Sequence, residues 1–197
     1  MADLILGSTT AITESGGKLT LGTPLGLTFA SLQVFETAGT PTWTPTDSNV
    51  SAVYVIVTGG GGGGGYRNVT NNFDSGGGGQ GGGTSIKWIT SGLGSTETVT
   101  VGAAGIGSTT ASTVTAQAGT SSFGSHCSAT GGECGHWGDN GGSMTLPGVG
   151  SGGDINLYGG CGICAMDGTA GWATAGNGGS SYWSGGGVGA NYQAGGA

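Results

Sequence analysis

Charged residues are scarce in this sequence, and basic residues are almost absent. Only 7% of the 197 residues are charged, against about 25% in an ordinary soluble domain. The formal net charge is −7, and the basic residues are Lys18, Arg67 and Lys87. Nucleic-acid binding requires a basic surface that neutralises phosphates, and three scattered cations cannot form one. The composition therefore excludes nucleic acid as an expected partner and argues against an anionic membrane surface.

Long apolar runs and helical periodicity are also missing. No run approaches the roughly 18 apolar residues of a membrane span, so membrane insertion is not expected. The first residues, Met1–Gly7, lack the basic region and apolar core of a signal peptide, which predicts that no such signal exports the chain. No window shows a helical period, and glycine is a poor helix former.

Glycine is what the sequence has in excess, with 51 residues. Such a composition is typical of disordered chains, and disorder is the alternative to a glycine-dense fold. Disordered segments are poor in aromatic residues, however, whereas this chain has five Trp, five Tyr and four Phe. The mean hydropathy is +0.06, which is slightly apolar. We therefore expect an ordered fold.

The chain is expected to have three parts. Residues 1–36 contain short apolar runs that predict a β attachment or oligomerisation segment, because so short a segment cannot bury a core alone; an ordinary N-terminal arm is the alternative. Residues 37–123 are predicted to form a β-strand core with glycine-run insertions, and residues 124–197 a glycine-rich distal region. The sequence stops within a glycine-rich pattern at Ala197, so we expect the natural chain to continue.

Alternating apolar patterns predict the individual strands. In the first part, strands are expected at residues 4–6, 18–21 and 32–35. A connector at residues 38–49 is expected to precede strands at 51–58, 84–90 and 96–101, with weaker candidates at 109–117 and 120–123.

Seven consecutive glycines, Gly59–Gly65, directly follow the apolar strand Ser51–Thr58, and a second run, Gly76–Gly83, is interrupted only by Gln80. Glycine can form an extended left-handed helix with about three residues per turn and a rise of about 3.1 Å. Without Cβ atoms, such helices can pack side by side and pair their N–H and C=O groups. Seven residues would span roughly 22 Å, close to the length of a strand.

These patterns predict an all-β fold: a short-stranded N-terminal part, then a β-sandwich-like, glycine-rich domain with stacked polyglycine II-type helices and almost no α-helix. The glycine runs do not indicate nucleotide binding. A phosphate-binding loop is followed by a helix, and a P-loop contains Gly-Lys-Ser/Thr; the sequence has neither.

A series of motifs occurs in a defined order along most of the chain. They are Phe35–Thr40, Trp43–Pro45, Gly59–Gly65, Gly79–Thr84, Thr98–Gly105, Gly119–Gly124, Ala129–Gly132, Gly150–Leu157 and Gly179–Gly187. This order resembles the glycine-rich domain at the distal end of bacteriophage tail fibres over about residues 35 to 197. Thr13–Leu21 also looks like phage-fibre sequence. The resemblance implies a tip adhesin whose loops contact the host surface, in a virion assembled in the host cytoplasm and released by lysis.

Aromatic residues between glycine clusters are the candidates for receptor contacts. Trp and Tyr on loops supply a large, rigid contact area at a small entropic cost. The candidates are Tyr66, Arg67, Asn71, Phe73, Trp137, Tyr158, Trp172, Tyr182 and Trp183. The non-glycine insert 66–74 is favoured as an exposed contact loop. The alternative for Trp137, Tyr158, Trp172, Tyr182 and Trp183 is packing over the polyglycine layer, and we expect most of these five to be structural.

Cysteine and histidine residues cluster in the distal part, at His126, Cys127, Cys134, His136, Cys161 and Cys164. Thiolates and imidazoles at such spacings can bind structural zinc, and Cys-x-x-Cys supplies two ligands from one turn. Disulfides, each stabilising by about 2–4 kcal/mol, or free thiols are the alternatives. A Cys–His dyad could be drawn from this set, with Asp139 as a third member, but no activating pocket is indicated. Paired carboxylates for glycoside cleavage are not visible. We expect no other cofactor and no enzymatic activity.

The functional hypothesis is a phage tail-fibre or tail-tip protein that attaches to a bacterial surface receptor without catalysis. The receptor would be a glycan or an outer-membrane protein. A homotrimer is expected, with other phage tail or baseplate proteins as partners. The alternative hypothesis is a structural glycine-rich filament or an ice-binding-type surface protein.

Overall fold

Every element that the structure describes is a strand, a turn or an extended segment, and none is a helix. The computed structural model describes residues 3–6, 9–15, 18–21, 31–46, 50–66, 75–109, 117–136, 145–164, 172–189 and 191–193. Within these ranges no helix is long and apolar enough to cross a membrane. The chain divides into two compact units, Met1–Val34 and Phe35–Ala197.

The first unit contains one antiparallel sheet of three short strands. Its order is β1 (Asp3–Leu6), β2 (Thr9–Ser15), β3 (Lys18–Leu21), with Ile12 of β2 opposite Leu4 on one side and Leu21 on the other. The strands expected at residues 4–6 and 18–21 are thus confirmed, and β2 was not predicted. The strand expected at 32–35 is wrong: Leu32 and Val34 are 86% and 66% exposed, and no strand pairs with this run.

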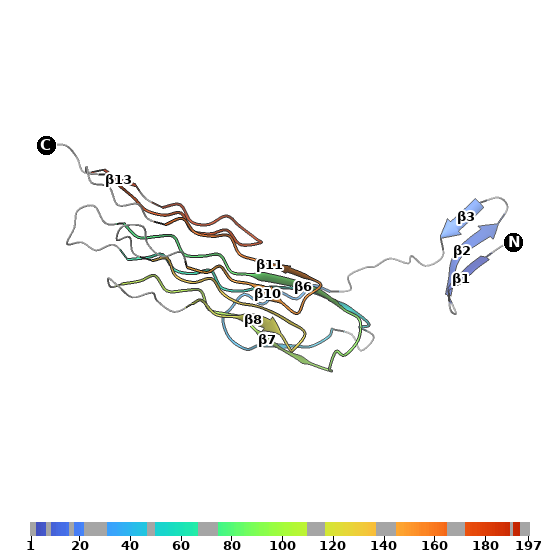
Figure 1. Cartoon of the computed structure of the whole chain (residues 1–197). Coiled ribbons are helices and arrows are strands. Elements are labelled where there is room, and N and C mark those ends of the chain that lie inside the picture. The colour runs from blue at the N-terminus through green and yellow to red at the C-terminus, as the bar shows by residue number, and fades with distance from the viewer. Residues whose placement is uncertain are drawn as a thin grey trace. The chain divides into compact units, whose positions relative to one another are not determined.

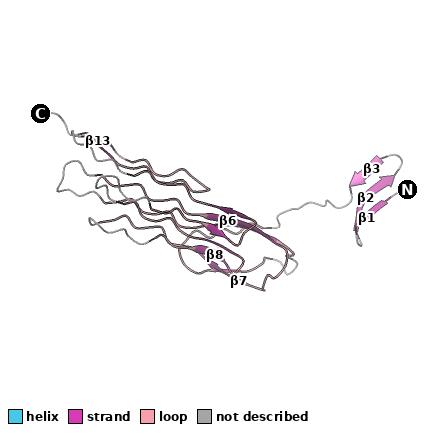
Figure 2. Cartoon of the chain, in the orientation of Figure 1, coloured by secondary structure: helices cyan, strands magenta, loops and turns pink. Residues whose placement is uncertain are grey.

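The second unit is built from antiparallel strands, of which β6, β7 and β8 lie at one end and β13 at the other (Figure 2). The strands are β4 (Thr42–Trp43), β5 (Val53–Thr58), β6 (Thr84–Ile89), β7 (Glu97–Thr100), β8 (Ser121–Phe123), β9 (Cys127–Ala129), β10 (Gly150–Ser151), β11 (Ile155–Leu157), β12 (Trp172–Thr174) and β13 (Asn191–Gln193). One sheet has the order β10-β9-β8-β7-β4 and a second the order β11-β6-β5, while β12 pairs with β13. Strands from both sides of residue 124 therefore share these sheets.

The two larger sheets enclose the core of this unit. Its buried members are Trp43, Val55, Val57, Ile89, Val99, Phe123, Cys127 and Ala129. Side chains from the inner faces of two sheets interdigitate in this way in a β-sandwich. The predicted strands at 51–58, 84–90, 96–101 and 120–123 are confirmed as β5 to β8, and most of the 109–117 candidate lies outside the described residues.

Trp43 corrects the prediction that residues 38–49 are only a connector. It lies in β4, which pairs with β7, and it is 7% exposed. Its ring meets that of Phe123 edge-on, with centroids 5.5 Å apart. A single large aromatic residue between two prolines is thus a core residue here, because the sandwich has few other bulky side chains.

Long extended segments run side by side from the sandwich (Figure 1), and hydrogen bonds connect them. We call seven of them struts A to G. They comprise residues 59–65 (A), 76–83 (B), 102–109 (C), 130–136 (D), 159–164 (E), 175–180 (F) and 185–189 (G).

Strut A shows how the segments are joined, because each of its three faces repeats every third residue. Toward strut B, the N–H groups of Gly59, Gly62 and Gly65 donate to the C=O groups of Gly83, Gln80 and Gly77, respectively. From strut D, the N–H groups of Gly132 and Gly135 donate to the C=O groups of Gly60 and Gly63. From strut C, the N–H groups of Gly105 and Ser108 donate to the C=O groups of Gly61 and Gly64. All are 2.8–3.0 Å long. A repeat of three is that of the polyglycine II helix. The predicted stack of such helices is confirmed.

Most strut glycines are required for close backbone contact. The described glycines with positive φ, namely Gly39, Gly92, Gly124 and Gly152, all lie outside the struts. In contrast, a Cβ at Gly62 would overlap the carbonyl oxygen of Glu133 in strut D. At Gly61, the next residue, a Cβ would meet nothing within 4 Å.

This difference predicts the effect of adding one methyl group at neighbouring positions. Gly62→Ala should destabilise the protein by about 1–3 kcal/mol, because the backbone of strut D must move away. Gly61→Ala should be neutral or should stabilise the protein by about 0.4–1 kcal/mol, because alanine lowers the conformational entropy of the unfolded chain. Denaturant unfolding of both variants measures this. Equal stabilities of the two would contradict the strut packing.

Candidate functional site

The struts place their outer ends together, away from the sandwich. Gly65 N–H donates to Gly77 C=O, Gly77 N–H donates to His136 C=O, and Gly78 N–H donates to Ile163 C=O. Segments 67–74, 110–116, 137–144 and 165–171, which lie outside the described residues, connect struts or shorter extended segments at this end.

Several predicted contact residues belong to those connecting segments. Arg67, Asn71, Phe73 and Trp137 lie outside the described residues. Tyr66 is half-buried at the end of strut A. These candidates therefore stay predictions, but they flank or belong to connections that start from one end of the bundle.

Three other predicted aromatic residues are exposed rather than packed over glycine. Tyr158 is 73% exposed, Trp183 65% and Tyr182 49%. Trp172 lies in β12, where only the backbone is described. For the first three, the alternative of burial over the polyglycine layer does not hold.

Tyr182 and Trp183 are held on a tight turn between struts F and G. Ser181 N–H donates to Ser184 C=O at 2.8 Å, and the Ser181 hydroxyl accepts from the N–H groups of Trp183 and Ser184 at 3.2 and 3.3 Å. The two rings meet edge-on, with centroids 4.9 Å apart. The Trp183 indole N–H donates to Thr58 Oγ1 at 2.9 Å, which ties the turn to the end of β5.

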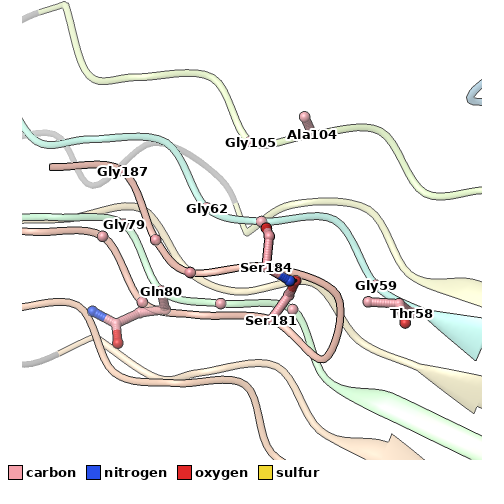
Figure 3. Close-up of a pocket in the computed structure, with 17 residues that line it drawn as sticks. Thr58, Gly59, Gly62, Gly79, Gln80, Ala104, Gly105, Ser181, Ser184 and Gly187 are labelled. Atoms are coloured by element: carbon pink, nitrogen blue, oxygen red, sulfur yellow. The ribbon is translucent and has the colours of Figure 1, made fainter.

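Beside this turn lies a groove of about 420 Å³ (Figure 3). Its walls come from the start of strut A, strut B, Ala104 and Gly105 of strut C, and the turn with the adjoining parts of struts F and G. Apart from backbone, it presents the hydroxyls of Thr58, Ser181 and Ser184. Gln80 also lines it, but its Oε1 accepts from Gly162 N–H at 2.9 Å in strut E. No charged residue lines the groove within the described part of the chain.

Sequence reasoning singled out Trp183, which lies on the turn beside the groove, but missed the groove itself. Its walls consist of glycine, serine and threonine, residues that occur throughout the chain. Only the path of the backbone distinguishes these positions from other glycines.

The sheet β11-β6-β5 also leaves apolar side chains exposed on the face opposite the core. Tyr54 and Trp88 are cross-strand partners whose ring centroids lie 5.8 Å apart, and they are 45% and 38% exposed. Ile155 and Leu157 of β11 lie on the same face and are 52% and 37% exposed. Sequence reasoning did not single out these residues, because alternation alone predicts two faces without saying which one is covered.

The charged groups of the sandwich have partners within it. Lys87 Nζ donates to the carbonyls of His126 and Gly152 at 2.9 and 2.7 Å. Gly94 N–H donates to Glu97 Oε1 at 2.8 Å, and this bond holds the pKa of that carboxyl below its usual value. His126 Nε2, 3.3 Å from the same oxygen, acts in the same direction.

The predicted cysteine and histidine cluster is spread over the sandwich and two struts. Cys127 lies in β9 within the core, Cys134 and His136 in strut D, and Cys161 and Cys164 in strut E. Cys134 is fully buried, and its Sγ donates to Gly64 C=O at 3.4 Å. Among the described residues, no three His, Cys, Asp or Glu side chains form a group that could hold a metal ion. Structural zinc stays a prediction.

Burial also governs the chemistry of Cys127. It raises the pKa of the thiol, and the nearby Lys87 offsets this only in part. A nucleophilic cysteine needs a lowered pKa, so Cys127 is in the opposite environment.

One family model matches residues 36–197, and it is described as a glycine-rich domain. No curated protein and no solved structure matches the chain.

Thiol reactivity tests the placement of the cysteines. In the native protein, iodoacetamide should modify the exposed Cys161 first, because the buried Cys127 and Cys134 are inaccessible. The latter two should be modified at least tenfold more slowly and should react fully once the chain is denatured. Peptide mass spectrometry of timed samples, with a parallel zinc assay, gives the result. A Cys161 thiol blocked in unreduced protein would indicate a disulfide, and stoichiometric zinc would indicate a metal site.

Proposed function

The chain belongs to the glycine-rich domain family over residues 36–197, and on this premise we propose that it is a phage tail-fibre or tail-tip protein. It attaches to a bacterial surface receptor, a glycan or an outer-membrane protein, by binding without catalysis. In this proposal the chain is part of the virion, is assembled in the host cytoplasm and is released by lysis.

The observation that carries the proposal is the common outer end of the struts. Gly65, Gly77 and His136 are hydrogen-bonded neighbours there, and the connections that follow them carry the predicted contact residues. A bundle joined through its backbone is a rigid support, and contact residues on loops that a rigid scaffold positions are the usual arrangement for recognition. The order of glycine motifs along residues 35 to 197 supports the same function.

Competition for adsorption tests this function directly. Purified protein added to susceptible bacteria should reduce adsorption of the phage that carries it. Tyr66→Ala and Trp137→Ala should each raise the half-inhibitory concentration about tenfold or more, because aromatic anchors contribute most to binding. Tyr54→Ala, at the sandwich end, is the matched control and should have no effect.

Absence of competition by the wild-type protein on every susceptible host would refute the attachment function. Thermal hysteresis in that case would favour the alternative of an ice-binding-type surface. The observation that favours this alternative is the regular stack of hydrogen-bonded struts.

The proposal includes a homotrimer, with the first unit joining the chain to other tail or baseplate proteins. The described part of Met1–Val34 contains the three-stranded sheet β1-β2-β3, and a unit below about 40 residues needs oligomerisation or a staple to be stable.

Sedimentation equilibrium of the full chain tests the trimer. The expected mass is three times the 18.7 kDa of one chain, and it should stay constant over a wide concentration range. A monomeric mass at every concentration would refute it.

A further inference from the structure

The groove beside the Tyr182–Trp183 turn exists because strut F ends one repeat of three residues before it would pair with Gly82 of strut B. Strut F follows strut B with bonds from Gly176 N–H to Gly76 C=O and from Gly179 N–H to Gly79 C=O. The next step of three would place residue 182 against Gly82. Instead the chain turns at Ser181–Ser184, so residue 182 donates no such bond.

This early turn leaves the C=O of Gly82 without the donor that strut F supplies to Gly76 and Gly79. Neither the N–H nor the C=O of Gly82 makes a hydrogen bond within the described part of the chain, and the same holds for the N–H of Gly61. Gly82 is buried among the struts and lines the groove. Gly61, in contrast, is exposed, so water can bond to its N–H. Buried backbone groups are paired in the great majority of cases, so the N–H and C=O of Gly82 favour a polar occupant that both donates and accepts hydrogen bonds.

Tyr182 and Trp183 form an aromatic platform. They do not line the groove themselves, but they lie on the turn at its edge, whose residues Ser181 and Ser184 do line it. The indole N–H of Trp183 is bonded to Thr58 Oγ1, which lines the groove, and the side chain stays 65% exposed. Tyr182 packs edge-on against it. A sugar ring has an apolar C–H face that can stack on such a platform and a rim of hydroxyls that both donate and accept. The hydroxyls of Thr58, Ser181 and Ser184 add further partners to those of the backbone (Figure 3).

The absence of charged residues from the described lining of the groove favours neutral saccharides over acidic ones. No charged residue lines it within the described part of the chain, and the whole chain has a net charge of −7. Uronates, sialic acids and phosphorylated sugars would lose hydration without gaining a cationic partner. The volume of about 420 Å³ lies within the roughly 300–1,000 Å³ typical of small-molecule sites.

We propose that this groove binds a neutral saccharide, with the hydroxyls of one sugar bonded to the N–H and C=O of Gly82 in strut B and an adjoining sugar ring stacked on Trp183 at the edge of the groove. The proposal rests on the attachment function in taking the saccharide to belong to the bacterial receptor. Its geometry rests on the groove alone.

Direct binding tests the proposal on the full chain. The probes are an array of neutral bacterial oligosaccharides and, as the contrast, an array of sialylated and uronic-acid oligosaccharides. Neutral members should bind, and the best of them should show saturation transfer from the protein in NMR and a measurable heat in calorimetry. The acidic members should bind at least tenfold more weakly.

Two glycines one strut repeat apart provide a matched pair of variants. Gly61 lines the groove, and an added Cβ there meets nothing within 4 Å. Gly64 does not line the groove, its carbonyl is bonded to strut C in the same way, and an added Cβ has only an ordinary contact at 3.9 Å. Gly61→Leu should reduce saccharide affinity at least tenfold, whereas Gly64→Leu should leave it unchanged.

The platform gives a second, independent pair. Trp183→Ala should reduce affinity at least tenfold, and Trp183→Phe, which keeps a ring without the bond to Thr58, should reduce it less. Trp88→Ala is the control, since Trp88 is an exposed aromatic residue elsewhere on β6.

The outcomes separate this proposal from the attachment function. No binding of any neutral saccharide, equal loss in Gly61→Leu and Gly64→Leu, or binding of hexaglycine in place of saccharide would overturn the groove proposal. Adsorption competition without saccharide binding overturns it as well, while the attachment function stands. Saccharide binding that Gly61→Leu abolishes supports it, even where the protein fails to compete for adsorption.

Discussion

Backbone hydrogen bonding between closely packed glycine helices is the interaction on which the second unit depends. Each residue of strut A directs its N–H or C=O toward a neighbouring strut according to its place in the repeat of three. Each such bond contributes only about 0.5–1.5 kcal/mol net, and glycine loses more backbone entropy on folding than any other residue. The bundle can be stable only if many of these bonds form together. A Cβ that pushes two struts apart therefore destabilises the bundle by more than the loss of one hydrogen bond, because neighbouring bonds between the same struts are also weakened.

The few larger residues inside the bundle are consequently confined to special positions. Gln80 interrupts the glycines of strut B, is 5% exposed, and uses its side-chain oxygen to accept from Gly162 N–H. Cys134 is fully buried in strut D and donates to the carbonyl of Gly64. A Cβ at Gly79 or Gly81, on either side of Gln80, or at Gly135, next to Cys134, would overlap the backbone of another strut. Gln80 and Cys134 thus fix the register that uniform glycine leaves undefined.

The sequence predicts the local conformation of this fold better than its pairings. The glycine runs indicate polyglycine II helices, and the alternating runs indicate β5 to β8, because both follow from local sterics and periodicity. Which struts are neighbours does not follow, since every glycine offers the same donor and acceptor. Strut A runs antiparallel to strut B but parallel to struts C and D, and no residue of Gly59–Gly65 marks that difference.

Trp43 and Leu32 show the same limit for apolar residues, because burial depends on which segments come to lie opposite them. Trp43 is a core residue, whereas Leu32 is 86% exposed. Among the candidate site residues, the aromatics on the turn were recognisable because Tyr and Trp are rare in a glycine background. The groove was not, since it results from a turn that comes one repeat before the strut would have continued.

A scaffold joined through its backbone also separates stability from recognition. The side chains of Tyr182 and Trp183 make no hydrogen bond to a strut; within the described residues, only the indole reaches back, to Thr58 at the end of β5. The turn itself is braced by Ser181, whose hydroxyl accepts from two backbone N–H groups. Under the proposed binding function, substitution of the two aromatics can therefore change what the surface binds while leaving the strut bonds in place. The same reasoning applies at the outer end, where Tyr66 follows the last glycine of strut A. In the function that we propose, specificity is therefore determined where the glycine helices end.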